Sequence, residues 1–290
     1  MTLVRMDELL KRAAAKHIGC GAFNVGNMEM VMGAVKAAEE MKCPIILQIA
    51  ERRLKHSPLE LMGPMMVQAA IESSADIAVH FDHGISISNI RKALELGFTS
   101  VMFDGSGLPL AENIEKTKAI SLIAAEFGAC LEGELGVVGG NEGEDVMIKT
   151  EYTNPADALE YSRAAGIDAL AVAIGNAHGH YICEPELKFD VLREIDEIVD
   201  VPLVLHGGSG MNAQQFQEAI QNGIRKVNIA TASFQELTRN VSSYVKSNSA
   251  PTYFGLNEAM VEGVYHNVKR HIEIFNFGIT VHFSMPRRWT

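Results

Sequence analysis

The sequence contains few cysteines and no long hydrophobic run. Its four cysteines in 290 residues, Cys20, Cys43, Cys130 and Cys183, stand singly and form no C-x-x-C pair. This spacing is not typical of a disulfide framework or of a structural zinc site, so we expect reduced thiols and a cytoplasmic protein. The absence of a secretory start and of an uncharged apolar run long enough to cross a bilayer predicts a chain that is neither exported nor inserted in a membrane.

Basic residues are outnumbered by acidic ones, 25 Lys and Arg against 36 Asp and Glu, and the formal net charge is −11. Without runs of basic residues, such a protein is not expected to bind nucleic acid or an anionic membrane surface. An anionic substrate would have to be held by a local pocket against this overall field. No Pro-, Gly- or Ser-rich linker divides the chain, so we expect one domain over residues 1–290, long enough to bury a large core.

Eight short apolar segments are distributed along the chain, and most are followed by a stretch of helical periodicity. They cover residues 18–25, 44–49, 77–81, 98–103, 129–135, 169–174, 202–205 and 226–229. Near-continuous apolar strands that alternate with helices are typical of a parallel sheet covered by helices. Their number predicts an α/β fold of the (β/α)8 or TIM-barrel class. A doubly wound open sheet is the alternative, but it would need a Gly-rich turn after the first strand, which residues 22–27 lack.

Helix start and stop signals support the alternation of strands and helices. Ser57-Pro58-Leu59-Glu60 has the form of a capping box with proline at the first helical position, and Asn154-Pro155 is predicted to open another helix. Glycines stand where three helices are expected to end, at Gly97, Gly128 and Gly223. Residues 257–275 carry apolar residues along one helical face, which predicts an additional C-terminal helix packed on the barrel or on a second subunit.

Polar side chains follow six successive strands of the predicted barrel, from the third to the eighth. These segments are His80-Phe81-Asp82-His83-Gly84, Asp104-Gly105-Ser106, Glu132-Gly133-Glu134-Leu135-Gly136, Gly175-Asn176-Ala177-His178-Gly179-His180-Tyr181, His206-Gly207-Gly208-Ser209-Gly210 and Asn228-Ile229-Ala230-Thr231. Catalytic side chains of this fold lie at the C-terminal ends of the strands. There, His83, His178 and His206 can converge above the barrel axis. Three neutral imidazoles with an open fourth position describe a catalytic zinc (Zn2+) site.

The remaining histidines are not expected to bind the metal. His80 lies on the same strand face as Asp82, opposite His83 if strand geometry persists to that point. His180 shares its strand end with His178, which already supplies one ligand. The others, His17, His56, His266, His271 and His282, are expected at the surface or in packing. A single histidine at a strand end is more often a hydrogen-bonded structural residue, and the joint placement of three favours the metal site.

Two segments after the seventh and eighth strands, residues 207–210 and 228–231, occupy the usual phosphate site of this barrel. Backbone N–H groups of a glycine turn and of a helix N-terminus bind a dianion well. A third segment, residues 139–145, is acidic, flanked by glycine and without apolar anchors. Its composition fits a mobile lid over the site and fits a solvated loop equally well.

These motifs, in this order, resemble those of the class II, metal-dependent ketose-bisphosphate aldolases, which include fructose- and tagatose-bisphosphate aldolases. The resemblance runs from about Gly21 to the motif after the eighth strand and into the C-terminal helix. Its most specific pieces are Phe81-Asp82-His83-Gly84, Glu132-Gly133-Glu134-Leu135-Gly136 with Gly139-Gly140, Ala177-His178-Gly179, Leu205-His206-Gly207-Gly208-Ser209-Gly210 and Lys226-Val227-Asn228-Ile229-Ala230-Thr231. The resemblance implies an aldehyde-lyase that reversibly cleaves a ketose 1,6-bisphosphate, or a related ketose 1-phosphate, into dihydroxyacetone phosphate and an aldehyde.

The resemblance also implies which residues hold metal ions. His83, His178 and His206 correspond to the zinc ligands of the family. Asp104 and Glu134 match acidic positions near the metal, as a second or resting ion site. A monovalent cation near the phosphate site is implied as well.

For the substrate, the resemblance implies that Asp82 is the acid/base that handles the C4 hydroxyl and that Glu142 is the lid carboxylate. The positions that correspond to triose-phosphate contacts are Asn24, Gly179, Gly207, Gly208, Ser209, Asn228, Ala230 and Thr231. A phosphorylated sugar is the implied partner, and the implied assembly is a homodimer or homotetramer.

The sequence departs from the family pattern after the second strand, where a hydroxyl residue of the distal phosphate site is expected. Glu51-Arg52-Arg53-Leu54-Lys55 stands there instead. Glu51 would repel a second phosphate if it pointed inward, whereas Arg52, Arg53 or Lys55 would bind one. The aldehyde half of the substrate and the preferred epimer therefore stay open.

Two other functions fit part of the pattern. A metal-dependent hydrolase on the same barrel would need an H-x-H pair on the first strand, where Gly21-Ala22-Phe23-Asn24 stands instead. A sugar-phosphate-binding barrel without catalysis is disfavoured because Asp82 and the three candidate ligands occur together.

Overall fold

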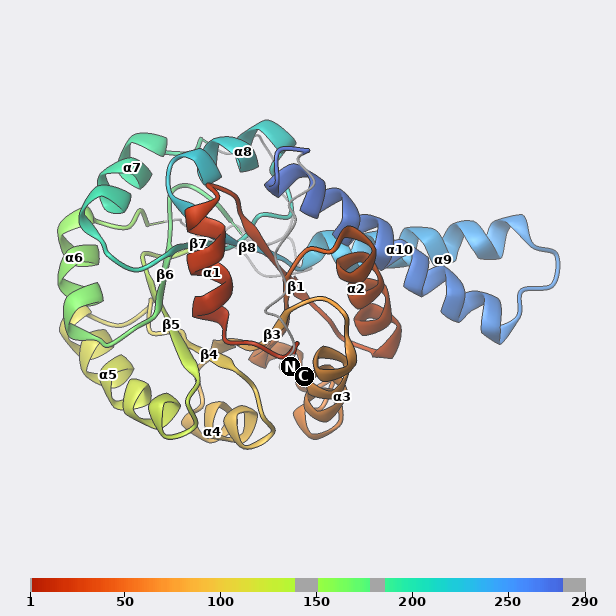
Figure 1. The fold of residues 1–290 in the computed structure, drawn as a ribbon, viewed down its shortest axis with the longest axis horizontal. Helices are drawn as coiled ribbons and strands as arrows, with labels where there is room; N and C mark the ends of the chain where they lie inside the picture. Colours follow the sequence, from red (N-terminus) through yellow and green to blue (C-terminus); the bar gives the residue numbers. More distant parts are fainter. Residues whose placement is uncertain (1, 139–150, 178–185, 279–290) are drawn as a thin grey trace, which may run out of the picture.

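A closed barrel of eight parallel strands forms the centre of the computed structural model, which describes residues 2–138, 151–177 and 186–278 (Figure 1). The strands are β1 (Cys20–Asn24), β2 (Ile45–Ala50), β3 (Ile77–Gly84), β4 (Ser100–Phe103), β5 (Cys130–Leu135), β6 (Ala169–Val172), β7 (Leu203–Leu205) and β8 (Ile224–Ile229). They pair in sequence order, and β8 pairs with β1 to close the barrel. The predicted (β/α)8 fold is confirmed, and all eight apolar segments coincide with strands.

One helix follows each strand and covers the outside of the barrel (Figure 1). These helices are α2 (Met28–Met41), α3 (Leu59–Glu72), α4 (Ile87–Glu95), α5 (Leu110–Glu126), α6 (Pro155–Ala164), α7 (Phe189–Ile198), α8 (Ala213–Gln221) and α9 (Thr231–Ser247). A short 3-10 turn, η1 (Glu51–Arg53), precedes α3. Two further helices, α1 (Met6–Ala15) and α10 (Tyr253–Phe275), lie before and after this repeat. No helix within the described parts of the chain is long and apolar enough to cross a membrane.

Helix α1, which was not predicted from the sequence, closes one end of the barrel. Its apolar side, with Met6, Leu9 and Leu10, packs on small interior residues of the strands such as Ala22 and Ala78. In Figure 1, α1 crosses the opening of the barrel on the side facing the viewer. The same cluster includes Cys20, Cys130 and Ala169, the first residues of β1, β5 and β6, so α1 covers the N-terminal end. The C-terminal strand ends lie at the opposite end.

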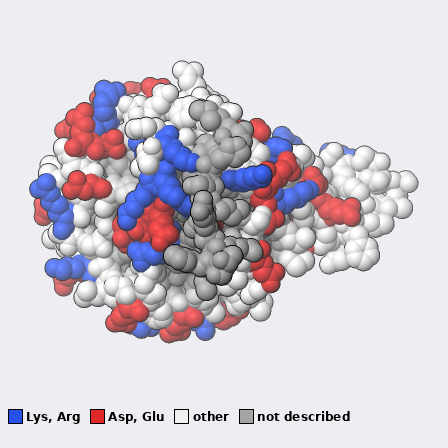
Figure 2. Space-filling view, in the orientation of Figure 1, with Lys and Arg blue, Asp and Glu red and all other residues white. Residues whose placement is uncertain are grey.

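The predicted C-terminal helix is present as α10 and begins at Tyr253, four residues earlier than expected. It packs against α2 and α9, with Val264, Val268 and Ile272 buried in these contacts. The outer parts of α9 and α10 project from the barrel as a pair (Figure 1). On the face shown in Figure 2 this projection carries mostly uncharged side chains, whereas acidic and basic side chains are interspersed over the barrel.

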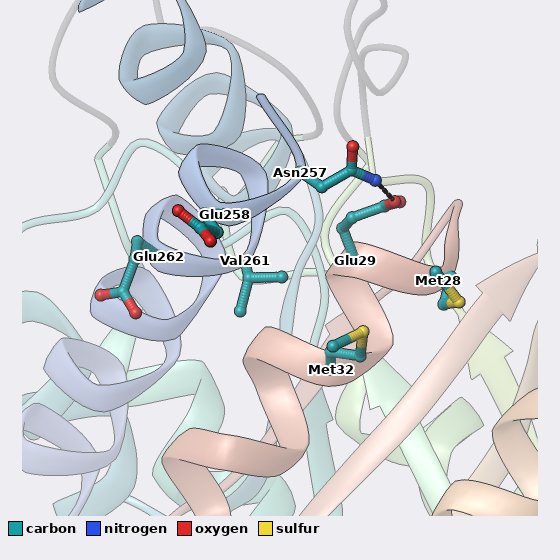
Figure 3. Close-up of a pocket in the computed structure, with 7 residues that line it drawn as sticks. All are labelled: Met28, Glu29, Met32, Asn257, Glu258, Val261 and Glu262. Atoms are coloured by element: carbon teal, nitrogen blue, oxygen red, sulfur yellow. Dashed lines mark hydrogen bonds between the residues drawn. The ribbon is translucent and has the colours of Figure 1, made fainter. Parts of the chain in front are cut away.

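A groove of about 240 Å³ lies between α2 and α10 (Figure 3). Met28 and Met32 of α2 line one side, Val261 of α10 lines the other, and the side-chain amide of Asn257 donates a hydrogen bond to Glu29 across it. None of the predicted site residues that the structure describes lines this groove. These residues lie instead at the C-terminal end of the barrel.

The capping box predicted at residues 57–60 is wrong. Pro58 has an extended ψ of 134° and flanks a helix that begins at Leu59, with no side-chain hydrogen bond at the cap. The Ser57 hydroxyl instead donates to the carbonyl of Gly26 at 2.6 Å, which ties the loop after β2 to the loop after β1. The other signals are confirmed, because Asn154 caps α6 and the three helix-stop glycines have positive φ angles.

Candidate active site

Asp82 and His83 reach the same point from the end of β3 because the strand loses its regular geometry there. Neighbouring side chains of a strand point to opposite faces. His83, however, has a left-handed backbone with φ of 47°, and the pairing of β3 with β4 shifts between Phe81 and Gly84. As a result, ligand atoms of Asp82, His83 and His206 all lie within 4.8 Å of one another.

The rings of His83 and His206 are nearly perpendicular, and one nitrogen of each ring approaches the other closely. His206 Nδ1 lies 3.0 Å from His83 Nε2, and both residues are buried. Two nitrogens bound to one zinc ion at about 2.0–2.1 Å in tetrahedral geometry would be roughly 3.3 Å apart. The two described histidines therefore fit a metal ion. His178, the third predicted ligand, lies outside the described residues.

The other ring nitrogen of His83 is held by carboxylates. His83 Nδ1 lies 2.8 Å from Asp104 Oδ2 and 3.7 Å from Glu134 Oε2, so these three residues form a second group able to hold a metal ion. Burial and the charge of Asp104 raise the pKa of Glu134 well above its ordinary value. A carboxylate on the far nitrogen of a ligating histidine orients the ring and makes it a better ligand.

Three side-chain amides hold the carboxylate of Asp82. Asn24 and Gln48 donate to Oδ2 at 3.1 and 3.2 Å, and Asn228 donates to Oδ1 at 3.2 Å. Hydrogen bonds to the charged form of a carboxyl group favour ionisation. Asn24 and Asn228 were expected to contact the substrate, and here both contact the expected base. Gln48 was missed, although its polarity within the apolar strand β2 is the signal that could have revealed it.

Electrostatics favour an ionised Asp82 beside a neutral His206. Burial raises the pKa of Asp82, but the charge of His83 and the other cationic neighbours outweigh it and lower the pKa. Burial, together with the charge of His83, lowers the pKa of His206 well below its usual value. Burial opposes protonation of His83 too, but the charge of Asp82 and the hydrogen bond with Asp104 raise its pKa to about 10. A metal ion bound at His83 would displace this proton.

The glycine turn after β7 has the conformation that the predicted phosphate site requires. Gly207 has φ of 66°, a backbone region that favours glycine. A Cβ atom on Gly208 would lie 2.9 Å from the ring of Phe216, so a side chain does not fit there. Glycine at these two positions therefore follows from the backbone conformation of the turn and from its close packing on Phe216 of α8.

The N-terminus of α9 lies against the same turn. Ser209 Oγ accepts a hydrogen bond from the backbone N–H of Ala232 at 3.2 Å, which joins the turn to the first residues of the helix. Ala230 precedes the helix and provides no side-chain cap. The hydroxyl of the first helical residue, Thr231, is buried and has no hydrogen-bond partner among the residues that the structure describes. Backbone donors at a helix N-terminus together with a glycine turn suit a phosphate group.

The loop after β2 places its charges in different surroundings. Glu51 accepts hydrogen bonds from the backbone N–H groups of Ile85 and Ser86, at the start of α4. The carboxylate of Glu51 is therefore held at the N-terminus of α4. The guanidinium of Arg53 stacks on the ring of Phe234, in the first turn of α9, at 4.4 Å from the ring centroid. Arg52 is exposed, as is Lys55.

Several predictions about the site concern residues that the structure does not describe. Gly179 and the lid residue Glu142 lie, like His178, outside the described residues and stay predictions. Two fully buried residues had no role predicted from the sequence: Glu132, which contacts His206, and Lys226, which pairs with Glu132. His80 binds Ser100 at 2.9 Å and belongs to neither metal-binding group.

Comparisons with known proteins agree with this geometry. The family model for class-II fructose-bisphosphate aldolase matches residues 4–278. The chain is 35% identical to a sulfofructosephosphate aldolase of Alkalicoccus urumqiensis over 95% of this chain and 97% of that protein. It is 37% identical to a fructose-bisphosphate aldolase of Geobacillus stearothermophilus over 83% of this chain and 85% of that protein.

Among solved structures, the YdjI aldolase of Escherichia coli K12 superposes with a TM-score of 0.85 and 33% identity, covering 94% of this chain and 97% of that chain. The matched family and these relatives are aldolases, so neither the hydrolase nor the non-catalytic barrel is supported. The chain belongs to the class-II fructose-bisphosphate aldolase family and is an aldehyde-lyase.

Proposed function

We propose that the protein is a zinc-dependent aldolase that reversibly cleaves a ketose phosphate into dihydroxyacetone phosphate and an aldehyde. The observation that carries this proposal is the meeting of Asp82, His83 and His206 at the C-terminal strand ends. Asn228 connects this group to the phosphate site, because it donates to Asp82 and stands three residues before α9.

In the proposed mechanism Asp82 takes the proton of the C4 hydroxyl when the bond between C3 and C4 breaks. Its ionised carboxylate is held in position for this by the amides of Asn24 and Gln48. Zinc, held by His83, His206 and the predicted ligand His178, would supply a Lewis acid for the negative charge that develops on the three-carbon fragment. Asp104 keeps the ring of His83 in the orientation that this requires.

The phosphate of the three-carbon fragment is proposed to bind between the glycine turn and α9. Backbone N–H groups of the turn and of the helix N-terminus would donate to it, and the buried hydroxyl of Thr231 would add a side-chain donor. The set of proposed contacts comprises Gly179, Gly207, Gly208, Ser209, Asn228, Ala230 and Thr231. A monovalent cation near this site remains part of the proposal, as does proton exchange at C3 by Glu142.

The charge at the distal end of the substrate is proposed to be bound by Arg53. The two curated relatives are named for substrates that share fructose and one phosphate and differ in the second charged group, a sulfo group or a phosphate. The guanidinium of Arg53 lies over Phe234, in the first turn of α9, so this loop reaches the helix whose N-terminus is proposed to bind the first phosphate. The carboxylate of Glu51 is hydrogen-bonded at the start of α4 and does not point into the site, so it would not repel a second phosphate.

Replacing Arg53 by alanine should therefore lower kcat/KM selectively for substrates with a second anionic group. Loss of a charge-assisted hydrogen bond costs about 1.5–3 kcal/mol, which corresponds to roughly 10–100-fold. The comparison is fructose 1,6-bisphosphate against fructose 1-phosphate, with the exposed neighbour in Arg52→Ala as the matched control. An equal effect on both sugars would mean that this loop does not bind the second anionic group. A ketose 1-phosphate would then be the favoured substrate.

The function itself is tested by condensation of dihydroxyacetone phosphate with three matched three-carbon aldehydes, one phosphorylated, one sulfonated and one uncharged. We expect rapid consumption of dihydroxyacetone phosphate with at least one charged aldehyde, abolished by a chelator and restored by zinc, because catalysis needs the metal. Full activity in metal-free protein, or a substrate adduct trapped on a lysine by borohydride, would contradict the proposal.

We further propose a cytoplasmic location and a homodimeric or homotetrameric assembly. Cys20, Cys43 and Cys130 are buried free thiols, as expected in a reducing compartment. Tyr253 and Phe254 are 70% and 74% exposed at the projecting end of α10, and large exposed aromatic residues favour contact with another subunit. Sedimentation velocity of the purified protein measures the assembly.

A further inference from the structure

Lys226 is a fully buried cation inside the barrel, and among the described residues predicted to contact the substrate it binds Asn228. It stands on β8, and its ammonium group lies 2.9 Å from Glu132 Oε2 and donates to Asn228 Oδ1 at 2.8 Å. Burying an ammonium is costly unless it is paired. Packing alone does not account for a buried ion pair at this position. Both partners of Lys226, Glu132 and Asn228, contact residues of the active site.

The first path runs from Lys226 through Glu132 to the ligand His206. The second carboxylate oxygen, Glu132 Oε1, lies 2.8 Å from His206 Nε2. The NH2 group of Asn228 also lies 3.2 Å from Nε2, but the carboxylate is nearer and charged. Glu132 therefore accepts the Nε2 proton, which leaves the lone pair of Nδ1 free for a metal ion. Nδ1 is the atom that faces His83 Nε2 at 3.0 Å. The pair thus selects the tautomer that the metal site needs.

The second path runs from Lys226 through Asn228 to Asp82. An asparagine side chain can present either its oxygen or its NH2 group in a given direction. Because an ammonium only donates, Lys226 requires the oxygen of Asn228 on its side. The NH2 group is then directed to Asp82 Oδ1, at 3.2 Å. One buried cation thus orients a neighbour of the metal ligand and a neighbour of the base.

We propose that Lys226 is a positioning residue that sets the tautomer of His206 through Glu132 and the orientation of Asp82 through Asn228. This inference rests on the proposed function, since it concerns the same metal site. It assigns a role to Lys226 and Glu132, which belong to neither group of described residues able to hold a metal ion. Loss of the pair should weaken zinc binding even where the fold stays intact.

The test compares zinc affinity with the stability of the metal-free protein. The variants are Lys226→Met, the charge-balanced double variant Glu132→Gln/Lys226→Met, and Glu132→Asp, which keeps both charges but withdraws the carboxylate from His206. The dissociation constant of zinc is measured by competition with a chelator, and Tm is measured without metal. Removing the outer partner of a ligating histidine typically costs 10–100-fold in metal affinity.

We expect Lys226→Met alone to lower Tm, because it leaves the Glu132 charge unpaired, and the double variant to recover Tm. Zinc affinity should stay about 10-fold or more below that of the parent in the double variant and in Glu132→Asp. Ser73→Ala, which removes a buried hydrogen-bond acceptor of the Ala75 N–H before β3, at the opposite end of the barrel, is the control and should bind zinc like the parent.

Parent-like zinc affinity in both the double variant and Glu132→Asp would overturn this inference and make the ion pair purely structural. Glu132→Asp alone carries the test if Lys226→Met does not fold. Failure of the parent protein to bind zinc would instead overturn the proposed function together with this inference. The two failures are therefore distinguishable.

Discussion

Replacing Asp82 by asparagine should lower turnover by about 100-fold or more while zinc remains bound. An amide has nearly the shape of the carboxylate but cannot take the C4 hydroxyl proton, and general acid–base catalysis typically contributes 10²–10⁴-fold. A 100-fold loss corresponds to about 2.7 kcal/mol of transition-state stabilisation. Because His83 and His206 are untouched, the metal content should stay at about one zinc per chain. The measurements are kcat of cleavage and zinc per chain.

An Asp-to-Asn substitution at the N-terminal end of the barrel, which α1 covers, provides the control. Asp76 pairs with Arg12 at 2.8 Å, far from the C-terminal strand ends, so Asp76→Asn should keep the kcat of the parent. A near-parental kcat in Asp82→Asn would mean that another group takes the C4 hydroxyl proton. Loss of zinc in that variant would make Asp82 a ligand, which its proximity to the two histidines permits.

The strands of the barrel could be predicted from the sequence because parallel strands are buried on both faces and form continuous apolar runs. Helix α1 could not be recognised in the same way, since its role depends on the small residues at the N-terminal end of the barrel on which it packs. The false capping box has a similar cause. Serine is a common helix-capping residue, but the hydroxyl of Ser57 donates a hydrogen bond to the carbonyl of Gly26, in a loop far away in the sequence.

The candidate site was predictable where several residue types recur at strand ends, as for Asp82, His83 and His206. Gln48 and Lys226 were missed because each is one polar residue within a strand, and its importance depends on which neighbours the register brings to it. Pairing places Gln48 between Asn24 of β1 and His80 of β3. Alternation along a strand identifies the interior face, but not the partners across the barrel.

Replacing His206 by alanine should remove both the metal and the activity. His206 supplies Nδ1 at 3.0 Å from His83 Nε2, and without it only one described histidine would remain at the point where the metal is expected. The loss of a ligand is more severe than the 10–100-fold cost of losing an outer hydrogen bond. Zinc should therefore fall from about one per chain to near zero, and cleavage should fall to the background rate.

The appropriate control is another buried histidine, because truncation of any buried ring leaves a cavity that lowers Tm. His271 is 3% exposed and packs against Phe23, Phe216 and Phe275 outside the barrel interior. His271→Ala should lower Tm yet retain zinc and activity in the folded protein. If His206→Ala keeps one zinc per chain and cleaves the substrate, the metal is held elsewhere, and the second group of His83, Asp104 and Glu134 becomes the candidate to test next.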